Sequence, residues 1–134
     1  MSEEFFDRQQ LINYRMERAR ETLGDARILL EQDGSPGSII NRAYYAMFYV
    51  VLSLLTTQGK GSSKHSGVIS LFDQLFIKTG KLPKDFSKAI HKAFDLRQIG
   101  DYREFVDLNQ EQAIEVLNAA DQFLKAVQNY LHNE

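Results

Sequence analysis

The sequence predicts an all-α protein, an up-down antiparallel bundle of four long helices with a short fifth as an option. Apolar residues recur at steps of three and four along most of the chain, which is the spacing of one helix face. Strand signals are absent, because no stretch alternates with period two and no turn dipeptide separates two β-branched runs. Short connections between long helices favour antiparallel neighbours. We expect a single domain over residues 1–134.

The first two expected helices precede residue 58. The first ends near Asp33-Gly34, and its apolar stripe alternates steps of four and three while charged residues occupy the other face. The stripe comprises Ile12, Met16, Ala19, Leu23, Ala26 and Leu30. The second helix spans residues 36–57, with Pro36 at its first position, and is apolar nearly all round. We therefore expect the second helix to be the most buried element.

A connection rich in glycine and serine, residues 58–63, separates the second helix from the third. The third helix is expected over residues 63–79, and Gly80 follows it as a C-terminal stop. Its apolar stripe comprises Val68, Leu71, Phe72, Leu75 and Phe76.

The last two helices are separated by glycine and by polar residues. The fourth is expected to begin at Pro83 and to run to about residue 99, where Gly100 breaks or frays it. The last begins near Asn109, because Gln112 three residues later completes a capping-box pattern. Its uninterrupted stripe comprises Ala113, Leu117, Ala120, Leu124, Val127 and Leu131.

Composition narrows the classes of function. The formal net charge of −2 gives no overall electrostatic reason to bind nucleic acid or an anionic membrane, so any such site must be local. The absence of cysteine excludes disulfides, thiolate metal sites and a cysteine nucleophile. We expect no metal and no cofactor. We also expect no membrane span, because the strongest apolar run, Ala43–Leu55, is shorter than the roughly 18 residues that a span needs. The N-terminus lacks a signal-peptide layout, so the expected setting is the cytoplasm.

Arg97 is the most informative residue, because it falls on an apolar helix stripe. It lies eleven positions after the first of four apolar residues on one face, Phe86, Ile90, Ala93 and Phe94. An unpaired buried guanidinium would cost several kcal/mol, on the order of the penalty for a buried charge. Two interpretations follow: either Asp101, one turn later, forms an ion pair with Arg97, or Arg97 lines a pocket for an anion.

The second helix offers further candidate ligand-binding residues. Arg42, Tyr45 and Tyr49 share one face, and both guanidinium and phenol groups donate hydrogen bonds to phosphate oxygens. The alternative is an aromatic-rich core helix whose hydroxyl groups reach solvent. The adjacent face is apolar and comprises Tyr44, Phe48, Val51 and Leu55.

Lys64-His65 opens the third helix, where free backbone N–H groups favour an anion. The alternative for this pair is a solvated junction between loop and helix. His91 lies about 120° around the fourth helix from Arg97, which favours a surface histidine. Tyr102 lies about 140° from Arg97 on an ideal helix, and a break at Gly100 would bring the two together.

Three blocks of sequence together carry a family resemblance: Asn41–Phe48 (NRAYYAMF), Lys64–Ile69 (KHSGVI) and Leu96–Tyr102 (LRQIGDY). In this order and spacing they resemble the HEPN domain superfamily, and within it the small stand-alone prokaryotic proteins of the UPF0332-like group. The resemblance implies a helical bundle that often forms homodimers with two arginine motifs face to face. Many HEPN proteins are metal-independent ribonucleases, frequently toxins encoded beside a nucleotidyltransferase antitoxin.

The active motif of those ribonucleases is an arginine followed after four to six residues by a histidine. Arg97 matches the arginine, whereas Tyr102 stands where the nuclease has its histidine. An ordinary tyrosine has a pKa of about 10 and is a poor base at neutral pH. Arg97 would lower that pKa and Asp101 would oppose the shift. The motif therefore favours binding over cleavage.

Three hypotheses remain. The first is a HEPN-like module that binds RNA or a nucleotide phosphate at a pocket of Arg97, Asp101 and Tyr102, as the HEPN half of a pair with a nucleotidyltransferase. The second is a metal-independent endoribonuclease that uses Arg97 with Tyr102 or His65. The third is a structural dimerisation module in which Arg97–Asp101 is only an ion pair. Further ligand-binding candidates are Arg42, Tyr45, Lys64 and His65.

Overall fold

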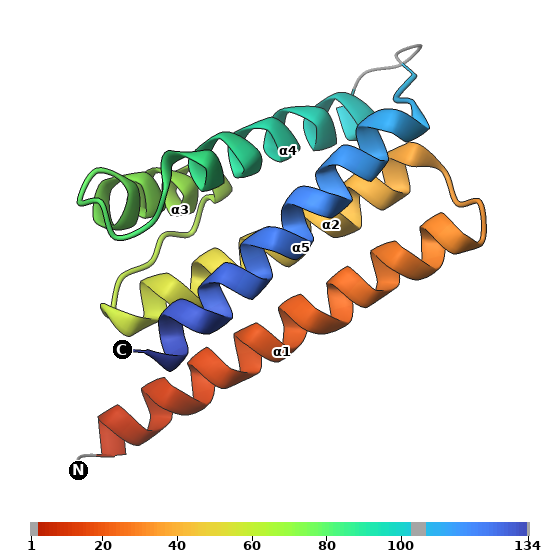
Figure 1. Ribbon diagram of the computed structural model, residues 1–134. Coiled ribbons are helices and arrows are strands. Elements are labelled where there is room, and N and C mark those ends of the chain that lie inside the picture. Colours follow the sequence, from red (N-terminus) through yellow and green to blue (C-terminus); the bar gives the residue numbers. More distant parts are fainter. Residues whose placement is uncertain (1–2, 103–106, 134) are drawn as a thin grey trace.

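The computed structural model describes residues 3–102 and 107–133, and within those ranges the chain is an all-α bundle without strands. Four long helices and one short helix are present, as the periodicity predicts, together with a single π-helical turn, η1. Figure 1 shows α1 and α4 running in one direction and α2 and α5 in the other. The elements are α1 (Glu3–Glu31), α2 (Pro36–Thr57), α3 (His65–Phe72), η1 (Asp73–Ile77), α4 (Lys84–Tyr102) and α5 (Gln110–His132).

Helix α2 is the centre of the bundle and contacts each of the other four α-helices. It is long and apolar enough to cross a membrane by length and composition, but 72% of its most apolar stretch is buried inside the protein. The predicted role of residues 36–57 as the core helix is therefore confirmed. Fully buried side chains from both of its apolar faces, such as Tyr44 and Leu54, join one hydrophobic core with α1, α3, η1, α4 and α5.

The helix ends use the local signals of the sequence. The Ser35 hydroxyl caps α2 by accepting from the Ser38 amide, and Asn109 and Gln112 form the predicted reciprocal capping box of α5. Beyond the end of α1, Asp33 takes the left-handed conformation with φ of 57°. The Gly34 amide then donates to the carbonyl of Leu29 at 2.6 Å, which satisfies one of the free carbonyl groups at the helix end.

Two boundaries differ from the prediction. Residues 63–79 form not one regular helix but α3 followed by η1, in which the Lys78 amide donates to the backbone carbonyl of Asp73 at 2.8 Å. Gly100 does not break α4, which continues to Tyr102. A Cβ atom at Gly100 would lie 2.9 Å from a methyl group of Leu108, so the glycine permits close packing at the end of α4.

Candidate functional site

Arg97 faces the interior edge of the bundle, as its place on the apolar stripe predicts. Ile90 and Ala93 on the same stripe are fully buried, and the Arg97 side chain is 14% exposed. Its Nε lies 2.9 Å from Oδ2 of Asp101, and its Nη2 donates to the Tyr45 hydroxyl at 3.1 Å. Arg97 thus forms the ion pair with Asp101 that the first interpretation predicts.

Aromatic rings surround this guanidinium. The Cζ atom of Arg97 lies 5.4 Å from the ring centre of Tyr45 and 5.8 Å from that of Tyr44. Arg42, which is half-buried, approaches the same Tyr45 ring with its own Cζ at 5.2 Å. Two guanidinium groups therefore share one tyrosine, and the Asp101 carboxylate offsets one of their two positive charges.

An open groove of about 440 Å³ adjoins Arg42 and Asp101. Its walls come from the end of α1, the start of α2 and the end of α4, and Gly37 and Gly100 leave room between the last two helices. The lining residues are Leu29, Ser35, Gly37, Ser38, Asn41, Arg42, Gly100 and Asp101. The groove is polar on the side of α2, and its carboxylate is the one that pairs with Arg97.

His65 joins the Arg97 cluster, so the solvated-junction alternative is wrong for this side chain. Its ring stacks on Phe48 with centroids 4.2 Å apart, and its Nδ1 lies 3.0 Å from the buried Tyr44 hydroxyl. Burial first, and then the nearby positive charge of Arg97, lower the pKa of His65. Burial also raises the pKa of Tyr44, against the opposing influence of Arg97, so its hydroxyl stays protonated.

Other predicted residues lie apart from this cluster. Lys64 is exposed just before α3 and has no side-chain capping bond. The backbone of Tyr102 ends α4, but its side chain lies outside the described residues, and the continuous helix removes the predicted break that would have brought it towards Arg97. His91 is exposed, as predicted, and its Nε2 contacts Oδ2 of Asp73 at 2.7 Å.

The sequence interpretation missed the role of Tyr44 in linking the cluster. It assigned Tyr44 to the core face, and the ring is indeed completely buried, but the hydroxyl reaches His65 on α3. The adjacent pair Tyr44-Tyr45 could have indicated this link. Adjacent helix residues point about 100° apart, so the two hydroxyl groups reach different partners, His65 and Arg97.

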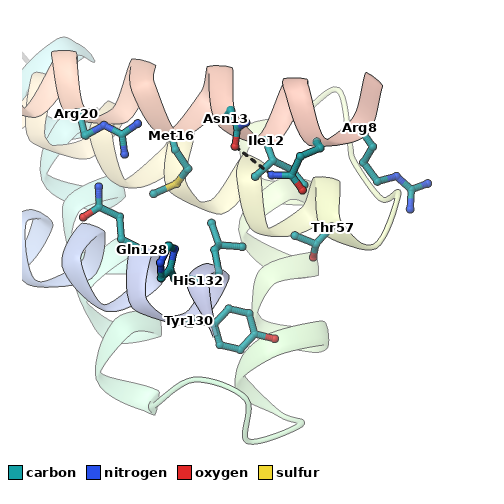
Figure 2. Close-up of a pocket in the computed structure, with 11 residues that line it drawn as sticks. Arg8, Ile12, Asn13, Met16, Arg20, Thr57, Gln128, Tyr130 and His132 are labelled. Atoms are coloured by element: carbon teal, nitrogen blue, oxygen red, sulfur yellow. Dashed lines mark hydrogen bonds between the residues drawn. The ribbon is translucent and has the colours of Figure 1, made fainter. Parts of the chain in front are cut away.

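A larger cavity, of about 570 Å³, lies away from this cluster. Figure 2 shows it between α1 and the last turns of α5, with Met16, Arg20 and Gln128 among its walls. Its lining contains none of the predicted site residues. Convergent charge and aromatic contacts, rather than volume, identify the Arg97 cluster as the candidate site.

Comparisons with known proteins place the chain among relatives of similar length. The family model of the HEPN domain matches residues 12–130. A UPF0332 protein of Thermotoga maritima is 39% identical over 127 residues, which cover 95% of this chain and 96% of that protein. Two proteins of Methanocaldococcus jannaschii also match. "Putative toxin MJ0605" is 31% identical, covering 87% of this chain and 85% of its own length, and "Putative toxin MJ0142" is 37% identical, covering 69% and 63%.

Proposed function

Because the chain belongs to the HEPN domain family, we propose that it binds RNA by holding a phosphodiester in the groove between the start of α2 and the end of α4. One observation carries this proposal: Arg42 and Arg97 approach the same Tyr45 ring, at 5.2 and 5.4 Å, beside an open groove. Arginine is suited to phosphate because its planar fork donates two parallel hydrogen bonds to one anion.

Asp101 affects how phosphate would bind at Arg97. It lines the groove and neutralises Arg97, so an incoming phosphate competes with this carboxylate for the guanidinium. The Asp101 side chain is 33% exposed, so its carboxylate is able to rotate into solvent and become hydrated. In the proposed complex the phosphate takes over the Arg97 contact, while Arg42 supplies the second positive charge.

Two relatives carry the word toxin in their names, which supports a toxin-like role for the RNA site. We extend the proposal to a cytoplasmic homodimer that works as the HEPN half of a pair with a nucleotidyltransferase partner. Exposed apolar side chains on α1, Leu11 and Ile28, offer surface for self-association. Light scattering of the purified protein and co-purification with the product of a neighbouring nucleotidyltransferase gene test these two parts.

The experiment for the RNA site is fluorescence anisotropy with a labelled single-stranded RNA, in EDTA and at two salt concentrations. Arg97→Ala is expected to weaken binding about tenfold, the loss of a charge-assisted contact, and Arg42→Ala to weaken it less. Asp101→Asn is expected to strengthen binding, because it removes the competing charge. Arg20→Ala is the matched control, since Arg20 pairs with Glu17 inside α1 and lines the other cavity.

The proposed function predicts opposite changes in RNA affinity for Arg97→Ala and Asp101→Asn, and the structural alternative does not. If Arg97–Asp101 only holds the fold, both variants lower stability and neither changes RNA affinity. Circular dichroism and thermal unfolding of each variant keep these two results apart. Wild-type protein that is folded and binds no RNA would reject the proposed function.

Metal-independent cleavage is a second candidate, favoured by the place of His65 in the same cluster. If Nδ1–H donates to Tyr44, the other ring nitrogen is free to take the proton of a ribose 2′-hydroxyl as that oxygen attacks the phosphorus. The 5′ oxygen then leaves and takes a proton from solvent water, and a 2′,3′-cyclic phosphate remains. The lowered pKa keeps His65 unprotonated near neutral pH, as a base must be.

Product analysis distinguishes cleavage from binding. RNA incubated with wild-type protein in EDTA should yield 2′,3′-cyclic phosphate ends if His65 acts as the base, and His65→Ala should abolish them while leaving RNA affinity largely intact. Intact RNA after incubation with folded, partner-free protein would leave binding as the function.

A further inference from the structure

The contact between Arg97 and Tyr45 has a second copy one helical turn along α2. Arg18 of α1 lies over Tyr49, with its Cζ 5.3 Å from the ring centre, and its Nη2 donates to the Tyr49 hydroxyl at 3.3 Å. The corresponding values for Arg97 and Tyr45 are 5.4 and 3.1 Å. In both copies an arginine from another helix approaches a tyrosine of α2 in the same way.

The two copies form one continuous surface. The rings of Tyr45 and Tyr49 have centroids 6.3 Å apart, and an arginine flanks each ring. We call the five residues Arg42, Tyr45, Arg97, Tyr49 and Arg18 the arginine–tyrosine strip. The strip follows α2 from Arg42, which lines the proposed phosphate groove, to Tyr49, with Arg97 of α4 beside Tyr45 and Arg18 of α1 beside Tyr49.

The far end of the strip is open to solvent. Arg18 is exposed, and Tyr14, one turn earlier on α1, is 61% exposed. Glu21 also lies within electrostatic range of Arg18 and partly offsets its charge. Exposed aromatic rings beside arginine are the groups that single-stranded nucleic acids use for stacking and backbone contacts.

We propose that Arg18 and Tyr49, with Tyr14 beside them, form a second nucleotide subsite, so that the chain binds a single-stranded RNA segment that extends from the Arg97 groove along α2. This inference rests on the proposed function. Four residues of α-helix rise about 6 Å, which is on the scale of one nucleotide of an extended strand. Arg18 then contacts a neighbouring phosphate, and the tyrosine rings stack on bases without reading their identity.

The alternative is that Arg18 and Tyr49 only help to hold α1 against α2. That alternative predicts a change in stability for Arg18→Ala but no change in RNA affinity beyond that of another surface arginine. Arg20 supplies the comparison, because it lies two residues further on the same helix, about 200° around it. Figure 2 shows Arg20 at the cavity between α1 and α5, and the lining of that cavity contains none of the five strip residues.

The experiment compares a dinucleotide with a labelled oligomer of about eight nucleotides, a length within the range of known single-strand sites. Wild-type protein is expected to bind the oligomer more tightly. Arg18→Ala is expected to weaken binding of the oligomer about fivefold and to lower its salt slope by about 0.7, the value for one lost phosphate contact on a single strand. Binding of the dinucleotide should not change.

Tyr49 variants test the ring separately from the charge. Tyr49→Phe keeps the stacking surface and should bind the oligomer nearly as well as wild type, whereas Tyr49→Leu should bind it more weakly. Thermal unfolding checks that each variant is folded. If Tyr49→Leu does not fold, Arg18→Ala still tests the subsite, because Arg18 is exposed.

The outcomes separate this inference from the function on which it rests. Equal effects of Arg18→Ala and Arg20→Ala on the oligomer, or equal effects of Arg18→Ala on both RNA lengths, overturn the second subsite and leave the Arg97 groove intact. An Arg97→Ala variant that binds both RNAs normally overturns the groove and the subsite together. Loss confined to the longer RNA in Arg18→Ala supports the extended site.

Discussion

Helix α4 contributes His91 and Arg97, six residues apart, to two polar clusters that differ in their surroundings more than in their residue types. His91 contacts Asp73, which also accepts a hydrogen bond from Ser87 at 2.6 Å, and the His91 side chain is 53% exposed. Arg97 contacts Asp101 and the Tyr45 hydroxyl, yet its side chain is 14% exposed and lies among aromatic rings. Each cluster joins a basic side chain, an aspartate and a hydroxyl, but only the second holds its basic group in a partly dry environment.

Burial beside a polar groove therefore marks a candidate site better than an inventory of chemical groups. Solvent screens the His91 pair, so its contribution to stability and its effect on any ligand are small. The Arg97 cluster is less screened, and therefore changes there should be felt both in the free energy of unfolding and in ligand affinity.

The largest expected effect is at Tyr44, the buried ring that links Arg97 to His65. Tyr44→Ala should lower the free energy of unfolding by about 3–5 kcal/mol, because it leaves a large cavity in the core. Tyr44→Phe should cost about 1–3 kcal/mol, since it leaves His65 Nδ1 without its hydroxyl partner. Urea denaturation followed by circular dichroism measures both. A loss for Tyr44→Ala below about 1 kcal/mol would contradict the role of this ring in the core.

A smaller loss is expected for Arg97→Ala. The variant removes an ion pair and two contacts with aromatic rings, but Asp101 remains able to reach solvent. We expect a loss of about 1–2 kcal/mol in the free energy of unfolding, with the helices still formed. The same urea titration measures it, and Arg97→Lys serves as the variant that keeps the charge and removes the planar fork. Global unfolding of Arg97→Ala would instead make Arg97 chiefly structural.

The corresponding change in the exposed cluster should be smaller again. His91→Ala removes the contact with Asp73 on η1 and is expected to cost less than about 1 kcal/mol. RNA affinity should be unchanged. An effect as large as that of Arg97→Ala would show that solvent exposure does not separate the two clusters.

The smallest expected effect is a pH dependence that originates at His65. Its folded-state pKa lies below the unfolded value of about 6.5, so in the range just below 6.5 the unfolded chain binds a proton that the folded chain does not. The free energy of unfolding should therefore fall as pH decreases below about 6.5, until the folded-state pKa is passed. Comparing wild type with His65→Gln at each pH isolates this component from other titrating groups. A His65 resonance that titrates above 6.5 in NMR would show that the sign is wrong.

Much of the fold could be predicted because the deciding information is local. Pro36 and the capping box of Asn109 and Gln112 lie at the helix ends that they determine, and the bounds of α2 match the prediction. The π turn and the continuity of α4 through Gly100 could not be predicted in this way. At Gly100 the local preference against helix is outweighed by close packing with Leu108, a tertiary contact.

In the candidate site, too, features set by spacing within one helix could be predicted, and features set by tertiary packing could not. The faces of Arg42 and Tyr45 on α2 and of Arg97 on α4 could be predicted because each follows from spacing within one helix, and the structure brings the two faces into contact. The partnership of His65 with Tyr44 depends on how α3 folds back beside α2, which no spacing within either helix specifies. The contact of Arg18 with Tyr49 likewise depends on the relative shift of α1 and α2.

The π turn also affects which changes in chain length the fold can accept. Because a π turn holds one residue more than an α turn, a deletion between Asp73 and Leu75 would convert η1 to regular α-helix and bring Phe72 and Phe76 three positions apart, still on one face. The same deletion between Ile90 and Arg97 would rotate the guanidinium by about 100° away from Tyr45. Homologous chains should therefore vary in length at η1, while the distance along α4 from the core to the arginine stays constant.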